Sequence, residues 1–173
     1  KATYWREKAD ALIAKQSEES HQRYIKAAEH GDIEAQCFLG REYYEKQDFE
    51  KAIYWYTKAA EQGDSYAQYL IGYCYDLGKG VEQSYEKAIR WYEKAAEQGN
   101  RAAYHNLGLC YLDGKGVPIS YTKAKEYITK ALEKSGDPAE QYLLALISYK
   151  QGEDHSEETF YWLHKSCGNG YEK

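Results

Sequence analysis

The chain has 173 residues, of which 43% are hydrophobic and 29% are charged, and its formal net charge is −5. This composition is typical of a folded domain that is long enough to bury a core. The sequence has no Lys/Arg cluster and no apolar run long enough to cross a bilayer, which argues against nucleic acid as a partner and against membrane insertion.

A short phrase recurs along the chain, for example "WYTKAAEQGD" at 55–64 and "WYEKAAEQGN" at 91–100. A period of this length predicts a repeat protein in which each unit packs on the next. We expect one repeat domain over 1–173, and we divide it at the glycine that ends each phrase. The predicted units are a divergent N-terminal unit 1–31, then 32–63, 64–99, 100–136 and 137–170, with 171–173 as the start of a further unit.

Each unit is predicted to hold two helices. The terminal glycine suits the left-handed end of one helix, and the residue after it, Asp32, Asp64, Asn100 or Asp137, is a cap for the next. A second set of caps, Asp48, Ser84 and Ser120, begins the second helix of three units. The second helices carry apolar residues at spacings of three and four, so each hairpin has a face that only a neighbouring hairpin can bury.

Two further columns indicate close packing between the helices. Gly40, Gly72 and Gly108 share one position of the first helix, which indicates close helix–helix approach because glycine otherwise weakens a helix. Tyrosines that recur in columns are expected in the core: Tyr43, Tyr75 and Tyr111, then Tyr56 and Tyr92, then Tyr85 and Tyr121.

The units Ala67–Gly99 and Ala103–Gly136 resemble the Sel-1-like repeat family, through the turn "GKGV", the alanine column and "KAAEQG". The resemblance covers Tyr24–Gly170, although unit 32–63 lacks the "GKGV" insertion and resembles a tetratricopeptide repeat. It implies an all-α fold, a right-handed superhelical solenoid of antiparallel helix pairs, about five in number. It also implies a scaffold or adaptor that binds another protein or a peptide segment, with no cofactor and no small-molecule substrate.

The roles that are common in this family suggest a bacterial adaptor or a toxin-immunity protein. The resemblance leaves the bacterial periplasm and the cytoplasm equally plausible as the location. In tetratricopeptide-like solenoids the first helix of each pair lines the concave groove. By this register we predict thirteen partner-binding residues, called the groove set below: Phe38, Arg41, Tyr44, Tyr66, Tyr69, Leu70, Tyr73, His105, Asn106, Leu109, Tyr142, Leu146 and Tyr149. The same register also includes Glu34, Cys37, Leu77, Leu112 and Leu143.

The groove set is aromatic and aliphatic where a solvated face is normally charged, and tyrosine is common at binding hot spots. The alternative is that these side chains only pack between neighbouring first helices. Tyr66, Tyr69 and Tyr73 stand at i, i+3 and i+7, so they form one stripe of one helix.

Other motifs favour structural roles. "SYEK" at 84–87 and "SYTK" at 120–123 match the S-x-x-K signature of penicillin-recognising enzymes, but both serines fall in the cap column and no "KTG" occurs. The "GKG" turns lack the spacing of a phosphate-binding loop. The four cysteines are predicted to be free thiols, and His164 with Cys167 is too small a set of ligands to predict a metal site. A penicillin-interacting enzyme and a purely structural spacer remain the alternatives to a scaffold.

Overall fold

The computed structural model describes residues 8, 18–152 and 157–166, and these residues form helices and turns with no strand. A helical stretch at 18–29 comes first. The labelled helices are α2 (Ile33–Glu45), α3 (Phe49–Glu61), α4 (Ser65–Leu77), α5 (Tyr85–Glu97), α6 (Arg101–Asp113), α7 (Tyr121–Ser135), α8 (Pro138–Lys150) and α9 (Glu157–Ser166). The predicted all-α fold is confirmed.

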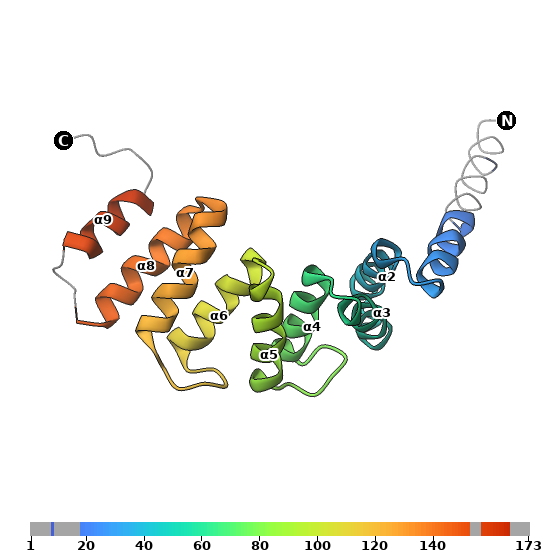
Figure 1. The fold of residues 1–173 in the computed structure, drawn as a ribbon, viewed down its shortest axis with the longest axis horizontal. Coiled ribbons are helices and arrows are strands. Elements are labelled where there is room, and N and C mark those ends of the chain that lie inside the picture. Colours follow the sequence, from blue (N-terminus) through green and yellow to red (C-terminus); the bar gives the residue numbers. More distant parts are fainter. Residues whose placement is uncertain (1–7, 9–17, 153–156, 167–173) are drawn as a thin grey trace.

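The helices are arranged as successive antiparallel pairs. Figure 1 shows the pairs α2–α3, α4–α5, α6–α7 and α8–α9 following one another in a curved row. Each helix contacts the next one in the chain, and the contacts within a pair are more extensive than those between pairs. Contacts that are local in this way define an α-solenoid, in which each unit is held mainly by its neighbours.

The helix boundaries follow the predicted caps. Before each of the first helices α2, α4, α6 and α8, the side chain of the capping residue accepts a hydrogen bond from a backbone N–H of the first turn. Asp48, Ser84 and Ser120 do the same for the second helices α3, α5 and α7. Gly63, between α3 and α4, has φ +92°, a conformation that side chains with a Cβ rarely adopt. The repeated phrase therefore encodes the end of one helix and the start of the next.

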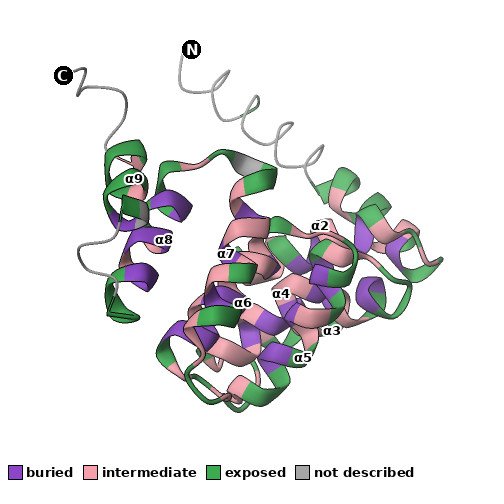
Figure 2. Cartoon of the chain, turned by 60° about the vertical axis from the view of Figure 1, so that its left-hand side comes forward, coloured by how far each residue is buried: buried purple, intermediate pink, exposed green. Residues whose placement is uncertain are grey.

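The core is a series of clusters that cross the unit boundaries. One cluster joins Tyr56, Ala59 and Ala60 of α3 to Ala67 and Ile71 of α4. The next cluster joins α5 to α6 in the same way, and a third joins α6 and α7 to α8. Figure 2 shows buried residues on the sides of the helices that face their neighbours. Each hairpin thus buries its apolar face against the next hairpin, as the sequence predicted.

The glycine column marks the closest approach of the two helices in a pair. A Cβ on Gly72 would lie 2.6 Å from the ring of Tyr92, and a Cβ on Gly40 would lie 2.4 Å from the ring of Tyr56. Both rings are fully buried. At Gly108 the side chain in this place is Ile128, at 2.5 Å. Glycine is therefore present at this column because a large side chain of the second helix packs directly on the backbone of the first.

The prediction that all columnar tyrosines are core residues is only partly right. Tyr56, Tyr92 and Tyr111 are buried, whereas Tyr43, Tyr75, Tyr85 and Tyr121 are half-buried. A lysine from the second helix lies over three rings of one column: Lys51 over Tyr43, Lys87 over Tyr75 and Lys123 over Tyr111. A lysine stem can cover an aromatic ring while its ammonium stays in water, so these tyrosines lie at the boundary of the core.

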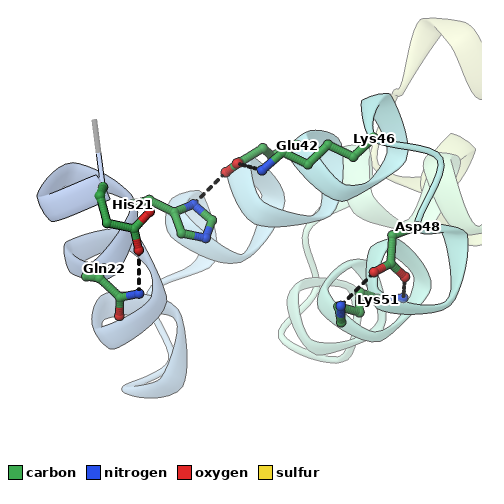
Figure 3. A network of polar contacts seen from close by, with 7 residues as sticks. His21, Gln22, Glu42, Lys46, Asp48 and Lys51 are labelled. Atoms are coloured by element: carbon green, nitrogen blue, oxygen red, sulfur yellow. Dashed lines mark hydrogen bonds and ion pairs between the residues drawn. The ribbon is translucent and has the colours of Figure 1, made fainter. Parts of the chain in front are cut away.

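The stretch 18–29 is attached to the solenoid through polar contacts as well as packing. His21 Nδ1 lies 2.9 Å from Glu42 Oε2, and Lys46 pairs with the same carboxylate from one turn further along (Figure 3). Asp48 pairs with Lys51 at the start of α3. Burial acts to raise the pKa of Glu42, but Lys46 and His21 outweigh it and hold that pKa below its usual value.

Candidate protein-interaction face

The groove set lies on the four first helices, α2, α4, α6 and α8, and none of its thirteen residues is buried. Arg41, Tyr66, Tyr142 and Tyr149 are exposed, and the other nine are half-buried. We call the surface that these residues form the first-helix face. Leu112 was predicted to share it, but Leu112 is 5% exposed and belongs to the core cluster of α6 to α8, so that prediction was wrong.

At the α2 end of the first-helix face the side chains form a pocket of about 330 Å³. Five of its lining residues were predicted to face the groove: Glu34, Cys37, Phe38, Arg41 and Tyr66. The sixth is Tyr24 of the 18–29 stretch, whose ring stacks on Phe38 with centroids 4.1 Å apart. The sequence did not identify Tyr24, because the first unit is too divergent for its register to be read.

Arg41 gives this pocket one permanent positive charge. Its guanidinium carbon lies 5.8 Å from the centre of the Phe38 ring, a cation–π contact that the aromatic wall provides. Arg41 is exposed, and within the described chain it forms no ion pair. The pocket therefore combines aromatic walls with an arginine that is available to a partner.

The three tyrosines of α4 form a continuous aromatic stripe. The ring centroids of Tyr66 and Tyr69 are 6.2 Å apart, and those of Tyr69 and Tyr73 are also 6.2 Å apart. Tyr69 also stacks on buried Tyr92 at 6.0 Å. Tyr69 and Tyr73 pack against the core cluster of α5 and α6, whereas Tyr66 is 48% exposed. The stripe therefore has one edge in the core and one edge on the surface.

Tyr44 of α2 joins the stripe from the neighbouring unit. Burial, followed by the nearby hydroxyl of Tyr73, raises the pKa of Tyr44. Burial also raises the pKa of Tyr69, with further contributions from Tyr73, Tyr66 and Tyr44. Tyr44 also packs against the core cluster of α3 and α4.

The α6–α8 boundary differs from the others, because Glu140 occupies the column that holds Ala35, Ala67 and Ala103 in the other units. Glu140 is 1% exposed. Its Oε1 accepts a hydrogen bond from Arg101 at 2.9 Å and lies 3.5 Å from Nδ1 of His105, whereas its Oε2 has no hydrogen-bond partner within the described chain. One ring nitrogen of His105 therefore already faces a carboxylate inside the protein.

Beyond this boundary the first-helix face becomes strongly aromatic again. Tyr142 and Tyr149 of α8 are 54% and 60% exposed. Leu109 and Leu146 are half-buried and pack against the core cluster of α6 to α8. Asn106 is half-buried. The exposed part of the groove set is thus concentrated at Arg41 and Tyr66 on one side and at Tyr142 and Tyr149 on the other.

The two S-x-x-K motifs have structural roles in the fold. Ser84 Oγ accepts a hydrogen bond from the backbone N–H of Lys87 at 3.4 Å, and Ser120 does the same for Lys123. The ammonium groups of these lysines lie over tyrosine rings, at 5.4 Å from the centre of Tyr75 and 4.9 Å from the centre of Tyr111. The serines act as helix caps and the lysines as covers for tyrosine rings.

Substitutions at Ser84 should separate the cap from a nucleophile. We expect Ser84→Ala to lower the free energy of unfolding by about 1 kcal/mol, and Ser84→Asp to leave it unchanged, because Asp48 caps α3 at the same column. Urea unfolding followed by circular dichroism measures both. A mass increase of the native protein after incubation with a β-lactam, absent from Ser84→Ala, would contradict the capping interpretation.

The "GKG" turn packs against the preceding pair of helices. A Cβ on Gly80 would come within 2.6 Å of the Phe49 backbone at the start of α3, and the ammonium of Lys79 lies 4.9 Å from the centre of the Phe49 ring. Glycine is needed here for close approach between neighbouring units.

Cys37, Cys74 and Cys110 are free, as predicted. Burial, with the Asp64 carboxylate nearby, raises the pKa of Cys37 to about 12. Burial raises the pKa of Cys74 to about 11, and the same cause raises that of Cys110 to about 11. Because the thiolate is the reactive form, these thiols are unreactive near neutral pH. Cys167, and with it the pair that Cys167 would form with His164, lies outside the described residues.

Neither a metal-binding cluster nor a membrane span occurs among the described residues. They contain no group of three or more His, Cys, Asp or Glu side chains placed to hold a metal ion. None of their helices combines the length and the apolar character that a membrane span requires.

The stacked helix pairs and the core clusters between them define the chain as an α-solenoid repeat protein. The Sel1 repeat family model matches residues 33–64, 65–100, 101–135 and 141–171. The chain belongs to the Sel1 repeat family. The comparison with curated proteins gives no significant match.

Two solved structures support this assignment. One is c5321, a protective antigen present in uropathogenic Escherichia coli strains that displays an SLR fold, with a TM-score of 0.78 and 32% identity over 88% of this chain. The other is a Sel1 repeat protein from Oxalobacter formigenes, with a TM-score of 0.74 and 36% identity over 88% of this chain. The match covers 34% of the first protein and 64% of the second, so this chain spans only part of each relative's length.

Proposed function

We propose that this chain is a non-catalytic scaffold that binds a partner protein through its first-helix face, in the concave groove, and that it serves as a bacterial adaptor. Sel1 repeat proteins are generally protein-interaction scaffolds, and both relatives described above are bacterial proteins. One observation carries the proposal: all thirteen residues of the groove set are exposed or half-buried, and only Arg41 among them has a permanent charge.

The side chains of the groove set suit a surface that binds another protein. Tyrosine buries a large area on binding, loses little side-chain entropy and keeps a hydroxyl for hydrogen bonding. Arginine and tyrosine are also among the residues most enriched at binding hot spots. The pocket beside Phe38 and Arg41 offers a recess in which a partner's side chain can be desolvated. The exposed tyrosines of α8 extend the same surface by two further units.

The test is a capture experiment on lysate of the native host, read by mass spectrometry. The groove variant carries Tyr66→Ala, Tyr142→Ala and Tyr149→Ala, the exposed tyrosines of the groove set. Tyr69 and Tyr73 are left intact because they pack against the core. The matched control carries Tyr54→Ala and Tyr161→Ala on the second helices α3 and α9, where both residues are 54% exposed.

We expect the native chain and the control to retain a partner that the groove variant loses, with a fall in affinity of at least about tenfold. Equal far-ultraviolet circular dichroism would show that all three proteins are folded. A partner retained by the groove variant and lost by the control would move the binding site to the second helices. Several partners of moderate affinity would indicate an adaptor, and one partner of very high affinity would indicate a toxin-immunity protein.

A further inference from the structure

We propose that the chain has a second binding site, a pocket between α5, α6 and α7 that receives an arginine side chain of a partner protein. The pocket has a volume of about 470 Å³ and is lined by Glu93, Ala96, Glu97, Tyr104, Tyr127 and Lys130. We call it the α5–α7 pocket. It shares no residue with the groove set, so it is a site separate from the proposed groove.

Tyr104 departs from the repeat at this pocket, because its column holds Gln36 and Gln68 in the two preceding units. Nε2 of Gln36 donates to the backbone carbonyl of Ala28 at 2.9 Å, and Gln68 makes the equivalent bond one unit later. Tyr104 makes no such bond among the described residues, so the equivalent carbonyl, that of Ala96, receives no side-chain donor. The α5–α6 boundary therefore lacks a hydrogen bond that its two predecessors have.

Glu93 departs from its column as well, since the equivalent residues of α3 and α7 are Thr57 and Thr129. Glu93 stands one turn before Glu97, and like charges at this spacing destabilise a helix. Neither carboxylate forms an ion pair or a hydrogen bond in the described part of the chain. Proteins break their own structural rules mainly at functional sites, and here Glu93 and Tyr104 break the repeat pattern in one pocket.

Two aromatic rings of the pocket already hold a cation of the chain itself. The ring centroids of Tyr104 and Tyr127 are 6.4 Å apart, with planes inclined by 31°. The ammonium of Lys130 lies 5.9 Å from the first centroid and 5.6 Å from the second. It also lies 2.7 Å from Oε1 of Glu126. Lys130 can therefore keep this ion pair while a cation from a partner takes its place on the rings.

The charges around the pocket leave room for one positive group. The carboxylates are Glu93 and Glu97 in its lining and Glu126 beside Lys130. The cations are Lys130 itself and Lys134, whose ammonium lies close to the end of α5. Three negative charges thus face two positive charges. A single cationic side chain would bring the site to neutrality, which is the charge complementarity that protein interfaces commonly show.

Arginine fits the chemistry of these groups better than lysine does. The guanidinium is planar, so it stacks on a tyrosine ring, and it is more weakly hydrated than an ammonium. Its five N–H groups form a fork that can donate to the carboxylates of Glu93 and Glu97 and to the carbonyl of Ala96. An ammonium is a point charge with three donors, so it serves fewer of these acceptors from one position on the rings.

The experiment is an NMR titration of the whole isotope-labelled chain with the peptide acetyl-Gly-Arg-Gly-amide. Two further peptides carry lysine or citrulline in place of arginine, and citrulline keeps the shape of arginine without its charge. We expect saturable shifts of the backbone amides of Glu93–Glu97 and Tyr104 with the arginine peptide. The lysine peptide should bind about threefold or more weakly, and the citrulline peptide about tenfold or more weakly.

Three variants test the residues. Glu93→Gln with Glu97→Gln should weaken the arginine peptide by about tenfold or more. The matched control is Glu45→Gln with Glu82→Gln, which changes the net charge equally at exposed sites outside the pocket and should bind as the native chain does. Tyr104→Gln restores the residue that this column holds in the preceding units, so it should fold normally and bind about threefold or more weakly.

Several results would overturn the proposal. These are equal binding of the lysine or citrulline peptide, full binding by the variant that lacks the Glu93 and Glu97 carboxylates, shifts centred on the groove set, or no saturable shift at millimolar peptide. The groove variant described above tests the proposed function separately. It should bind the arginine peptide as the native chain does, so a partner that it loses reports on the groove alone.

Discussion

Replacing Tyr92 with alanine should lower the free energy of unfolding by about 3–5 kcal/mol, the largest effect that we expect from one substitution. The Tyr92 side chain is 0% exposed. Its ring fills the space above Gly72, where even a Cβ would come within 2.6 Å of it, and it stacks on Tyr69. Alanine would leave a cavity between α4 and α5 that packed helices cannot close without moving.

Urea unfolding monitored by circular dichroism at 222 nm measures this effect. Tyr92→Phe is the matched control, because it removes only the hydroxyl that donates to Asp76, and it should cost about 1 kcal/mol. Tyr54→Ala, at an exposed site on α3, should change the free energy by less than about 0.5 kcal/mol. A cost for Tyr92→Ala no larger than that for Tyr54→Ala would show that this ring is not part of the core.

The stacking of Tyr69 on Tyr92 links stability to binding. Tyr69 stacks on Tyr92 and belongs to the α4 stripe, so the position of the stripe depends on the α4–α5 core. In a solenoid each unit is held by its neighbours, so a cavity at Tyr92 acts first on the units that it touches. Loss of binding in Tyr92→Ala would therefore reflect displaced tyrosines. For this reason the groove variant described above replaces only exposed tyrosines.

The fold could be predicted because the same structural requirement recurs at the same position of several repeats. Asp64, Asn100 and Ser84 could be recognised as caps by comparing columns, and each accepts the predicted backbone hydrogen bond. Gly40 and Gly72 were recognised as sites of close approach because glycine in a helix needs a reason. A single Asp or Gly, seen in one unit alone, would not have distinguished a helix cap or a close contact from an ordinary loop residue.

The details of the candidate site were less predictable where a residue departs from its column. Glu140 replaces an alanine, and its partners Arg101 and His105 come from a different unit, so no local pattern indicates that the carboxylate is buried. Tyr24 lines the α2 pocket from a unit whose register is too divergent to align. Register alone also predicted that Leu112 lies on the groove, although Leu112 is buried in the core cluster of α6, α7 and α8.

Raising the pH above about 10 should unfold the protein cooperatively. Burial is the main cause that raises the pKa of Tyr56 and of Tyr92 above the usual tyrosine value of 10.0. The pKa is raised in the folded state, so the stability linked to each tyrosine is complete below the unfolded pKa and is lost as the pH rises toward the folded pKa. Each of these tyrosines should remove about 1.4 kcal/mol per pH unit above 10, because only the unfolded chain releases its proton.

The buried thiols start this loss at a lower pH. The ordinary thiol pKa of 9.0 is raised to about 11 for both Cys74 and Cys110, so stability should begin to fall just above pH 9. Circular dichroism and tyrosinate absorbance near 295 nm, recorded on the same samples, follow unfolding and ionisation together. We expect the last tyrosines to ionise only as the helices melt. In Tyr92→Phe the stability should fall less steeply above pH 10, by about 1.4 kcal/mol per pH unit. Complete tyrosine ionisation near pH 10 with the helices intact would contradict this account, because it would require the rings of Tyr56 and Tyr92 to reach solvent in the folded protein.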